Sequence, residues 1–183
     1  MTWPGHSVLQ VPVPPLEPFV RVRHAHYDPA WVSADPAFVH AHVTALGPWL
    51  AEPSPADLAV VAEVAASVEP FDFVLERVAT FASGIVHLVP EPDAAFQALT
   101  ERLTAAFPQC PPYAGEFAPV PHLTLDLRSP EVSEESTRAL LGDVVPARCR
   151  ADSLDLAWYE ADGCRLVHRW PLGRRRPVLG SAP

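Results

Sequence analysis

The order of predicted elements repeats in the two halves of this chain, and this repeat restricts the fold more than any other feature. Each half contains a helix, then a strand that starts with the pattern His-x-Thr, then a helix, then a pair of strands. Apolar residues recur at helical spacing in the helices and at alternate positions in the strands. We therefore expect an α+β fold in which a duplicated unit forms two lobes related by a pseudo-twofold axis.

The boundaries of these elements follow from capping residues, prolines and alternation. Ser54 followed by Pro55 is typical of a helix start, and Asp93 and Ser133 precede two further segments with helical periodicity. The predicted helices cover residues 16–23, 54–69, 93–107 and 133–142. The predicted strands cover residues 6–13, 41–46, 71–78, 84–89, 122–127, 147–160 and 164–172. The last two strands form a long hairpin around a turn at 161–163.

Length and hydropathy favour one two-lobed domain, which we assign to residues 1–173. Hydrophobic residues make up 49% of the 183-residue chain, enough to bury a substantial core. Residues 174–183, which include Arg174, Arg175 and Arg176, have little to bury and are expected to form a mobile tail. No segment approaches the roughly 20 apolar residues that span a bilayer, and the N-terminus does not resemble a signal peptide. We expect a cytoplasmic protein with no membrane partner, and we favour a monomer.

Charge and cysteine content narrow the possible partners. The formal net charge is −9, which disfavours a protein that binds long nucleic acid through its phosphates. A small phosphate ester, a nucleotide or an RNA terminus remains possible, because a local pocket can have the opposite sign. Cys110, Cys149 and Cys164 form no CxxC pair and are expected to be free, buried thiols. No spacing suggests a metal site, so we expect neither metal nor cofactor.

Two His-x-Thr segments contain the predicted functional residues. Side chains alternate across a strand, so His42 and Thr44 share one face, and so do His122 and Thr124. An imidazole can give or take a proton near neutral pH, and a threonine hydroxyl can donate to a phosphate oxygen. If the two segments face each other, they supply a base, an acid and two donors around one phosphorus atom. We predict His42 and His122 as catalytic residues and Thr44 and Thr124 as substrate-binding residues.

Five segments resemble the 2H phosphoesterase superfamily, in particular its bacterial 2′-5′ RNA ligase-like proteins. They are AHVTALGPW (41–49), FDFVLERV (71–78), GIVHLVPEP (84–92), FPQCPPYAGEF (107–117) and PHLTLDL (121–127). The resemblance implies two lobes of antiparallel sheet with outer helices and a central cleft. It also implies metal-independent cleavage or formation of 2′,5′ or cyclic phosphodiester bonds, with the two motif histidines as the proton-transfer pair. Many RNA-acting relatives carry an arginine soon after the second motif, whereas here the nearest is Arg128, and this difference argues against ligase activity.

Further aromatic and histidine residues lie close to the motifs in sequence. Trp49 and Tyr113 are predicted to bind substrate by stacking on a nucleobase, with packing at the rim as the alternative. His40 either supports the site or is an exposed neighbour at the strand end. His87 either points into the cleft or is an ordinary hydrogen-bonded histidine of the sheet.

The remaining histidines and the function leave alternatives open. His24 and His26 are expected to be ordinary surface groups, and His168, like His87, either points into the cleft or is an ordinary hydrogen-bonded histidine of the sheet. The first hypothesis is a metal-independent phosphodiesterase that acts on a cyclic phosphate or a short 2′,5′-linked oligonucleotide. The second is a non-catalytic module that binds a phosphorylated ligand or a partner protein in the same cleft. The third is an enzyme whose cleft performs other acid-base chemistry on a metabolite.

Overall fold

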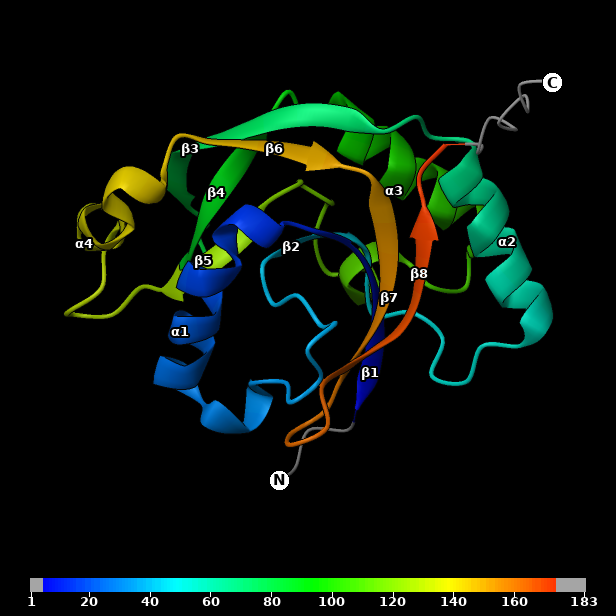
Figure 1. The fold of residues 1–183 in the computed structure, drawn as a ribbon, viewed down its shortest axis with the longest axis horizontal. Coiled ribbons are helices and arrows are strands. Elements are labelled where there is room, and N and C mark those ends of the chain that lie inside the picture. Colours follow the sequence, from blue (N-terminus) through cyan, green and yellow to red (C-terminus); the bar gives the residue numbers. More distant parts are fainter. Residues whose placement is uncertain (1–4, 174–183) are drawn as a thin grey trace, which may run out of the picture.

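The computed structural model describes residues 5–173, and the predicted tail at 174–183 lies outside them. The helices are α1 (Glu17–Tyr27), α2 (Pro55–Ala66), α3 (Ala94–Ala106) and α4 (Glu134–Leu141), with 3-10 turns at Pro14–Leu16, Pro29–Trp31, Pro112–Gly115 and Gly142–Val144. The strands are β1 (His6–Pro12), β2 (His42–Leu46), β3 (Phe71–Thr80), β4 (Ile85–Glu91), β5 (Leu123–Leu127), β6 (Ala147–Ala151), β7 (Ser153–Tyr159) and β8 (Arg165–Pro171). Figure 1 shows their arrangement.

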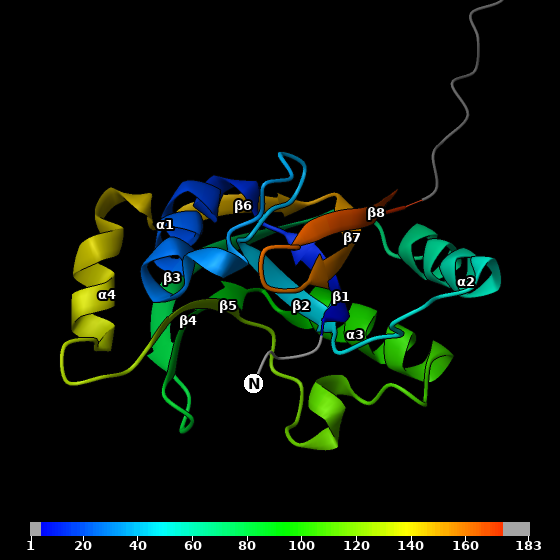
Figure 2. The same ribbon diagram turned by 90° about the horizontal axis from the view of Figure 1, so that it is seen from below.

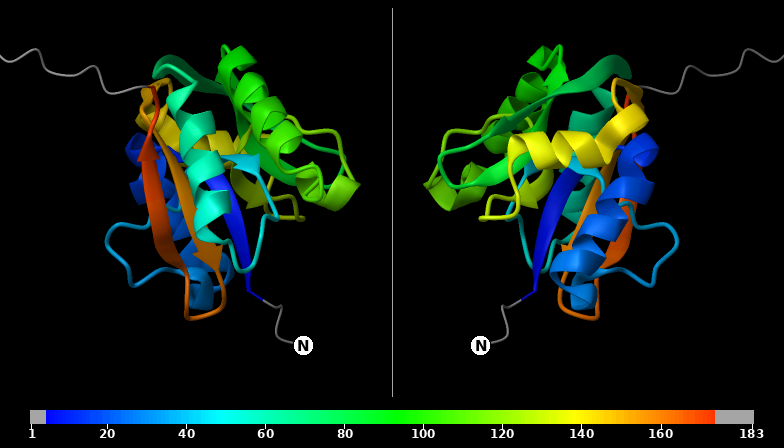
Figure 3. Two further views of the ribbon diagram at one scale, coloured as in Figure 1. Left: turned by 90° about the vertical axis from the view of Figure 1, so that its right-hand side faces the viewer. Right: turned by 90° about the vertical axis from the view of Figure 1, so that its left-hand side faces the viewer.

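The strands form two antiparallel sheets, and each sheet has a His-x-Thr strand at one edge. One sheet has the order β2-β1-β7-β8 and the other has the order β5-β4-β3-β6. The two edge strands β2 and β5 lie next to each other (Figure 2). The helices α2 and α3 lie at one end of the molecule, and α1 and α4 lie at the other (Figure 3). The predicted α+β fold, with antiparallel sheets and outer helices, is confirmed.

The long strand predicted at 147–160 is wrong, because this segment forms two strands in different sheets. β6 pairs with β3, whereas β7 pairs with both β1 and β8. The change of sheet occurs at the exposed Asp152, which belongs to neither strand. Burial differs accordingly, because β6 alternates between buried and exposed residues while almost all of β7 is buried. Only the pair β7 and β8 forms the predicted hairpin.

The first helix also differs from its prediction, whereas the second helix agrees with it. α1 continues to Tyr27, so His24 and His26 lie within the helix rather than beyond its end. α2 begins after Ser54, whose hydroxyl accepts from the backbone N–H of Asp57 while the Asp57 carboxylate accepts from the Ser54 N–H. This reciprocal capping satisfies two backbone donors that the helix leaves unpaired.

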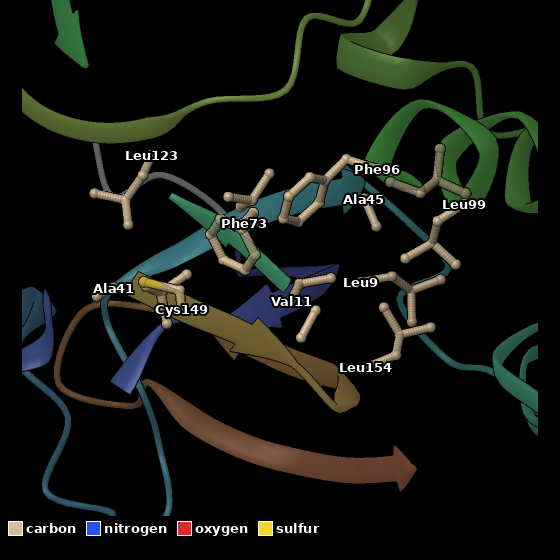
Figure 4. Close-up of a cluster of buried hydrophobic side chains, with 14 of the residues drawn as sticks. Leu9, Val11, Ala41, Ala45, Phe73, Phe96, Leu99, Leu123, Cys149 and Leu154 are labelled. Atoms are coloured by element: carbon tan, nitrogen blue, oxygen red, sulfur yellow. The ribbon is translucent and has the colours of Figure 1, made fainter. Parts of the chain in front are cut away.

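One hydrophobic core joins the inner faces of both sheets and the helix α3. Its members come from both lobes, as Figure 4 shows for Leu9, Val11, Ala41, Ala45, Phe73, Phe96, Leu99, Leu123, Cys149 and Leu154. The motif strands contribute their alternate residues Val43, Ala45, Leu123 and Leu125, so the opposite face carries the His-x-Thr side chains. All three cysteines are free and buried, as predicted. Within residues 5–173, no helix is both long and apolar enough to cross a bilayer.

Candidate active site

The two motif histidines occupy equivalent positions at the start of the two edge strands. His42 is the first residue of β2, and His122 directly precedes β5. His42, Thr44 and His122 are half-buried and Thr124 is exposed, while the residues between them are buried. The alternation predicted from the sequence therefore places each histidine and its threonine on the face away from the core.

Both histidines are held through the same ring nitrogen. Nδ1 of His42 donates to the backbone carbonyl of His40 at 2.7 Å, and Nδ1 of His122 donates to the carbonyl of Val120 at 2.7 Å. A carbonyl oxygen only accepts hydrogen bonds, so Nδ1 carries a proton in each ring. In the neutral ring the lone pair then lies on Nε2, and within residues 5–173 neither Nε2 has a hydrogen-bond partner. Each ring thus presents a nitrogen that can take or, once protonated, give a proton.

Tyr159 and Gln10 support the ring of His42 from the neighbouring strands. The Tyr159 hydroxyl donates to Oε1 of Gln10 at 2.7 Å and lies 3.2 Å from Nδ1 of His42. Because that hydroxyl proton is already used, the oxygen can accept a share of the Nδ1 proton. Burial raises the pKa of Tyr159, so its hydroxyl stays protonated and acts only as a hydrogen-bonding support.

His40 is a buried support of the strand, and the expectation that it is an exposed neighbour is wrong. Its side chain is fully enclosed, Nε2 accepts from the backbone N–H of Ser33 at 3.0 Å, and Nδ1 donates to Glu17 at 2.6 Å. The other Glu17 oxygen accepts from the N–H of Ala41. Burial alone would raise the pKa of Glu17, but the bonds from His40 and Ala41 outweigh it and lower the pKa. This carboxylate thereby fixes the backbone that enters the first motif.

Burial and, to a smaller extent, the charges of other histidines depress the basicity of His42. Burial lowers the pKa of His42 to about 4, against the bond to the His40 carbonyl, which raises it. Charges on His24, His122 and His40 lower this pKa further. Burial also lowers the pKa of His24 to about 4, and its ring meets that of His40 edge-on at 5.3 Å.

The ring of His122 lies among aromatic residues from β4, from the turn between β3 and β4, and from the 3-10 turn at Pro112–Gly115. Phe81 meets it edge-on at 4.9 Å, and Tyr113 stacks on it at 6.3 Å with 25° between the planes. His87, which pairs directly opposite Thr124, is buried, meets His122 at 5.4 Å and stacks on Phe81 at 3.9 Å. Burial lowers the pKa of His122, and the charge of His87 lowers it further, whereas the Val120 carbonyl raises it.

A buried carboxylate connects the second motif strand to two helices. Asp126 accepts from Nε of Arg23 at 2.7 Å and from the Tyr27 hydroxyl at 2.9 Å, both on α1. Its other oxygen accepts from the Thr137 hydroxyl on α4 at 2.6 Å. Because α1 connects β1 to β2, this network joins one motif strand to the helix that precedes the other.

Comparison with known proteins assigns the chain to a family. The family model of the 2′-5′ RNA ligase superfamily matches residues 11–163. The chain belongs to this superfamily. The resemblance to 2H phosphoesterases predicted from the motifs is therefore confirmed. The comparison with curated proteins gives no match.

Solved structures share the fold of this 2′-5′ RNA ligase superfamily member at low sequence identity. Escherichia coli LigT complexed with 3′-AMP has a TM-score of 0.56 and 17% identity, covering 94% of this chain and 100% of that chain. The protein TT0787 of Thermus thermophilus has a TM-score of 0.57 and 18% identity, covering 93% and 100%. A phosphoesterase has a TM-score of 0.52 and 16% identity, covering 94% and 100%. These structural similarities show that the fold is shared. The chemistry has to be argued from the residues of this chain.

Trp49 and Tyr113, the two aromatic residues predicted to bind substrate, have different surroundings in the structure. Trp49 is 6% exposed and packs edge-on against Phe107 at 5.2 Å, so packing accounts for it and we propose no stacking role. Tyr113 lies beside His122, and its backbone N–H donates to the carbonyl of Gly47 at 2.8 Å. Its φ of 51° is in the left-handed region, which costs a tyrosine on the order of 1–3 kcal/mol and is typical of functional sites.

Three cavities lie beside the motif residues. One of about 220 Å³ borders Thr44 and Tyr113, and one of about 350 Å³ borders Thr124 and Arg23. A third, of about 430 Å³, borders His122 and Tyr113. In the part of the chain that the structure describes, no group of three or more His, Cys, Asp or Glu side chains is arranged to hold a metal ion.

The sequence analysis did not predict the residues that hold the motif strands and the ring of His42 in place. Glu17, Arg23, Asp126 and Tyr159 all contact motif residues or their strands through partners far away in sequence. The one available signal was Asp126 itself, which stands inside the predicted strand two residues after Thr124. Alternation does not place these two side chains on one face, because β5 bulges between them: Thr124 pairs with His87 and Asp126 pairs with the adjacent Val86. A charged residue inside a strand next to a predicted site indicates a buried partner.

Proposed function

We propose that this chain is a metal-independent phosphodiesterase that hydrolyses a cyclic phosphate or a short 2′,5′-linked oligonucleotide. The observation that supports it most is the matched state of the two motif histidines. Both rings are fixed through Nδ1, both leave Nε2 without a partner among residues 5–173, and each is sensitive to its histidine neighbours. Two such nitrogens are what in-line displacement at phosphorus requires, one to accept a proton and one to donate it.

The reaction assigns a role to each motif residue. One of the two imidazoles, His42 or His122, removes a proton from the attacking water as the new P–O bond forms. The other protonates the oxygen that leaves. The hydroxyls of Thr44 and Thr124 donate to the non-bridging oxygens, whose negative charge is redistributed in the transition state. The acid-base pair is complete without a metal ion, which is why we propose metal-independent chemistry.

The substrate is proposed to be small. The three cavities beside the motifs have volumes of about 220, 350 and 430 Å³, which suits a nucleotide or an RNA terminus. The net charge of −9 opposes a long polyanion. Solved structures of LigT contain 3′-AMP, ATP or NADP⁺, which are ligands of the proposed class. We propose hydrolysis rather than ligation, and a cytoplasmic location.

A substrate screen in the presence of a chelator tests the proposal. Cyclic nucleotides, 2′,5′-linked dinucleotides and nicked RNA are incubated with the protein and EDTA, and products are separated by chromatography. We expect hydrolysis of at least one of the first two classes at a rate that EDTA leaves unchanged. Loss of activity with EDTA and its return with a divalent ion would contradict metal independence. Tight binding of these compounds without turnover would instead favour a non-catalytic binding module.

A further inference from the structure

A cavity of about 350 Å³ lies between α1 and β5. α1 and the 3-10 turn after it contribute His24, Tyr27 and Trp31 to its lining, and β5 contributes Thr124 and Leu127. The side chain of His24 is half-buried in this place rather than a surface group. Because Thr124 is proposed to hold the phosphate, the cavity receives a part of the substrate that lies next to the phosphate.

The imidazole of His24 has hydrogen-bonding capacity that the rest of the chain does not use. Within residues 5–173, neither ring nitrogen has a hydrogen-bond partner, and the ring meets that of His40 edge-on at 5.3 Å. Burial lowers the pKa of His24 to about 4, and the charge of His40 lowers it further, whereas that of Glu17 raises it. The ring is therefore neutral at physiological pH, with one nitrogen that donates and one that accepts.

The charged groups around the cavity favour an uncharged occupant. The Arg23 guanidinium is already paired with the buried carboxylate of Asp126. The Tyr27 hydroxyl donates to the same carboxylate and accepts from the backbone N–H of Leu127. The carboxylate of Asp28 borders the cavity as well. Two carboxylates against one paired arginine would repel a second phosphate.

A sugar hydroxyl matches the neutral ring of His24. A hydroxyl both donates and accepts, as the neutral imidazole does, and it is the group that distinguishes a ribonucleotide from a deoxyribonucleotide. The hydroxyl nearest the phosphate stands on the adjacent sugar carbon. A 2′,5′-linked dinucleotide carries this hydroxyl, and so does the product of cyclic phosphate hydrolysis. A phosphate held at Thr124 would bring it to the cavity that His24 lines.

We propose that His24 is a substrate-binding residue that hydrogen-bonds the sugar hydroxyl next to the phosphate, so that the cavity between α1 and β5 selects ribonucleotides over deoxyribonucleotides. This inference rests on the proposed phosphodiesterase function and deepens it, because it specifies the sugar of the substrate. His24 takes no part in proton transfer. Its edge-on contact with His40 holds the ring in the orientation that meets the hydroxyl.

Calorimetric binding of 3′-AMP and 2′-deoxy-3′-AMP tests the inference without any need for turnover. The parent should bind 3′-AMP about three- to tenfold more tightly than the deoxy compound, as expected for one hydrogen bond between neutral groups. His24→Phe keeps a ring against His40 and removes both hydrogen-bonding atoms. It should raise the Kd of 3′-AMP by the same factor and leave the Kd of the deoxy compound unchanged. His24→Gln keeps a donor and an acceptor and should retain most of the preference.

His26→Phe is the matched control for His24→Phe. His26 lies on the same helix, is exposed and does not line the cavity, so this variant should bind both nucleotides as the parent does. Equal weakening of both nucleotides in His24→Phe would mean that His24 acts only through its packing on His40. An unchanged preference for 3′-AMP in His24→Phe would mean that the hydroxyl binds elsewhere. Either result overturns the inference.

Turnover measured in parallel separates the inference from the proposed function. On a 2′,5′-linked dinucleotide, His24→Phe should raise KM by about three- to tenfold with little change in kcat, because the ring contributes to binding and not to the chemical step. If the parent hydrolyses phosphodiesters but His24→Phe leaves KM and the preference for 3′-AMP unchanged, the inference fails and the proposed function stands. If the parent shows the His24-dependent preference but hydrolyses no phosphodiester, the proposed function fails and the sugar contact is supported as a binding contact.

Discussion

At the scale of single residues, the backbone carbonyl two positions before each motif histidine determines which ring nitrogen is left without a partner among residues 5–173. The carbonyls of His40 and Val120 hold Nδ1 of His42 and His122 at the same distance of 2.7 Å. The same relation holds at His87, whose Nδ1 donates to Ile85 at 3.2 Å, so it is a property of the local backbone as much as of the site.

The pH dependence of turnover follows from the lowered pKa values of the two motif histidines. The base must be unprotonated and the acid protonated, so kcat/KM rises through one pKa and falls through the other. The pKa of His42 is lowered to about 4 and that of His122 is lowered from 6.5. We expect a bell-shaped profile with its maximum between about pH 4 and 6.5. A maximum above about pH 7, measured after confirming that the protein stays folded at each pH, would contradict it.

The threonines are expected to contribute less than the histidines. Thr44→Val and Thr124→Val each remove one donor to a charged oxygen and keep the shape, so each should lower kcat/KM by about 10- to 100-fold. Thr104→Val is the matched control, because within residues 5–173 this hydroxyl on α3 has no hydrogen-bond partner and lies outside the three cavities. Steady-state kinetics on the best substrate decide the matter. Unchanged kcat/KM in both motif variants would exclude the threonines from phosphate binding.

At the scale of elements, the buried Asp126 links β5 to α1 and α4 through hydrogen bonds and an ion pair. Asp126→Asn leaves the Arg23 guanidinium without its counter-charge, and removal of one partner of a buried pair typically costs about 3–5 kcal/mol. Some of this cost is relieved here because Arg23 is partly exposed. We therefore expect unfolding in urea to show a loss of about 2–4 kcal/mol.

The exposed pair of Arg150 and Asp72 provides the control for this prediction. Its geometry resembles a salt bridge, but both side chains are more than half exposed, so Asp72→Asn should cost less than about 1 kcal/mol. Equal losses of stability in Asp126→Asn and Asp72→Asn would mean that the network around Asp126 does not hold the elements together.

Local patterns in the sequence predicted most elements, and long-range contacts explain the rest. Alternation located the motif strands, and the Ser54-Pro55 start located α2, because each signal lies within one element. The break at Asp152 depends on two strands entering different sheets, which no local pattern encodes. The burial of His40 likewise depends on Glu17, which lies 23 positions earlier in the chain.

At the scale of the whole molecule, two lobes that share one core bring β2 and β5 together, so ligand binding should stabilise the whole fold. We expect 3′-AMP to raise the melting temperature, since a ligand at about 100 times its Kd stabilises the native state by about 2.7 kcal/mol. Double-stranded RNA at the same phosphate concentration should give a smaller rise because the net charge is −9. Thermal melting measures both. A larger rise with the duplex than with 3′-AMP would contradict a small-substrate site.

The central claim is that His42 and His122 form one proton-transfer pair, and kinetics of the parent, His42→Ala, His122→Ala and the double variant in EDTA test it most directly. With a cyclic nucleotide or a 2′,5′-linked dinucleotide, whose leaving group is a poor one, each single variant should lose about 10²–10⁴-fold in kcat. The double variant should lose little more than the worse single variant, because the pair acts as a unit. All four should melt within a few degrees of one another, because both side chains face away from the core. Near-parent turnover in either folded single variant would contradict the account.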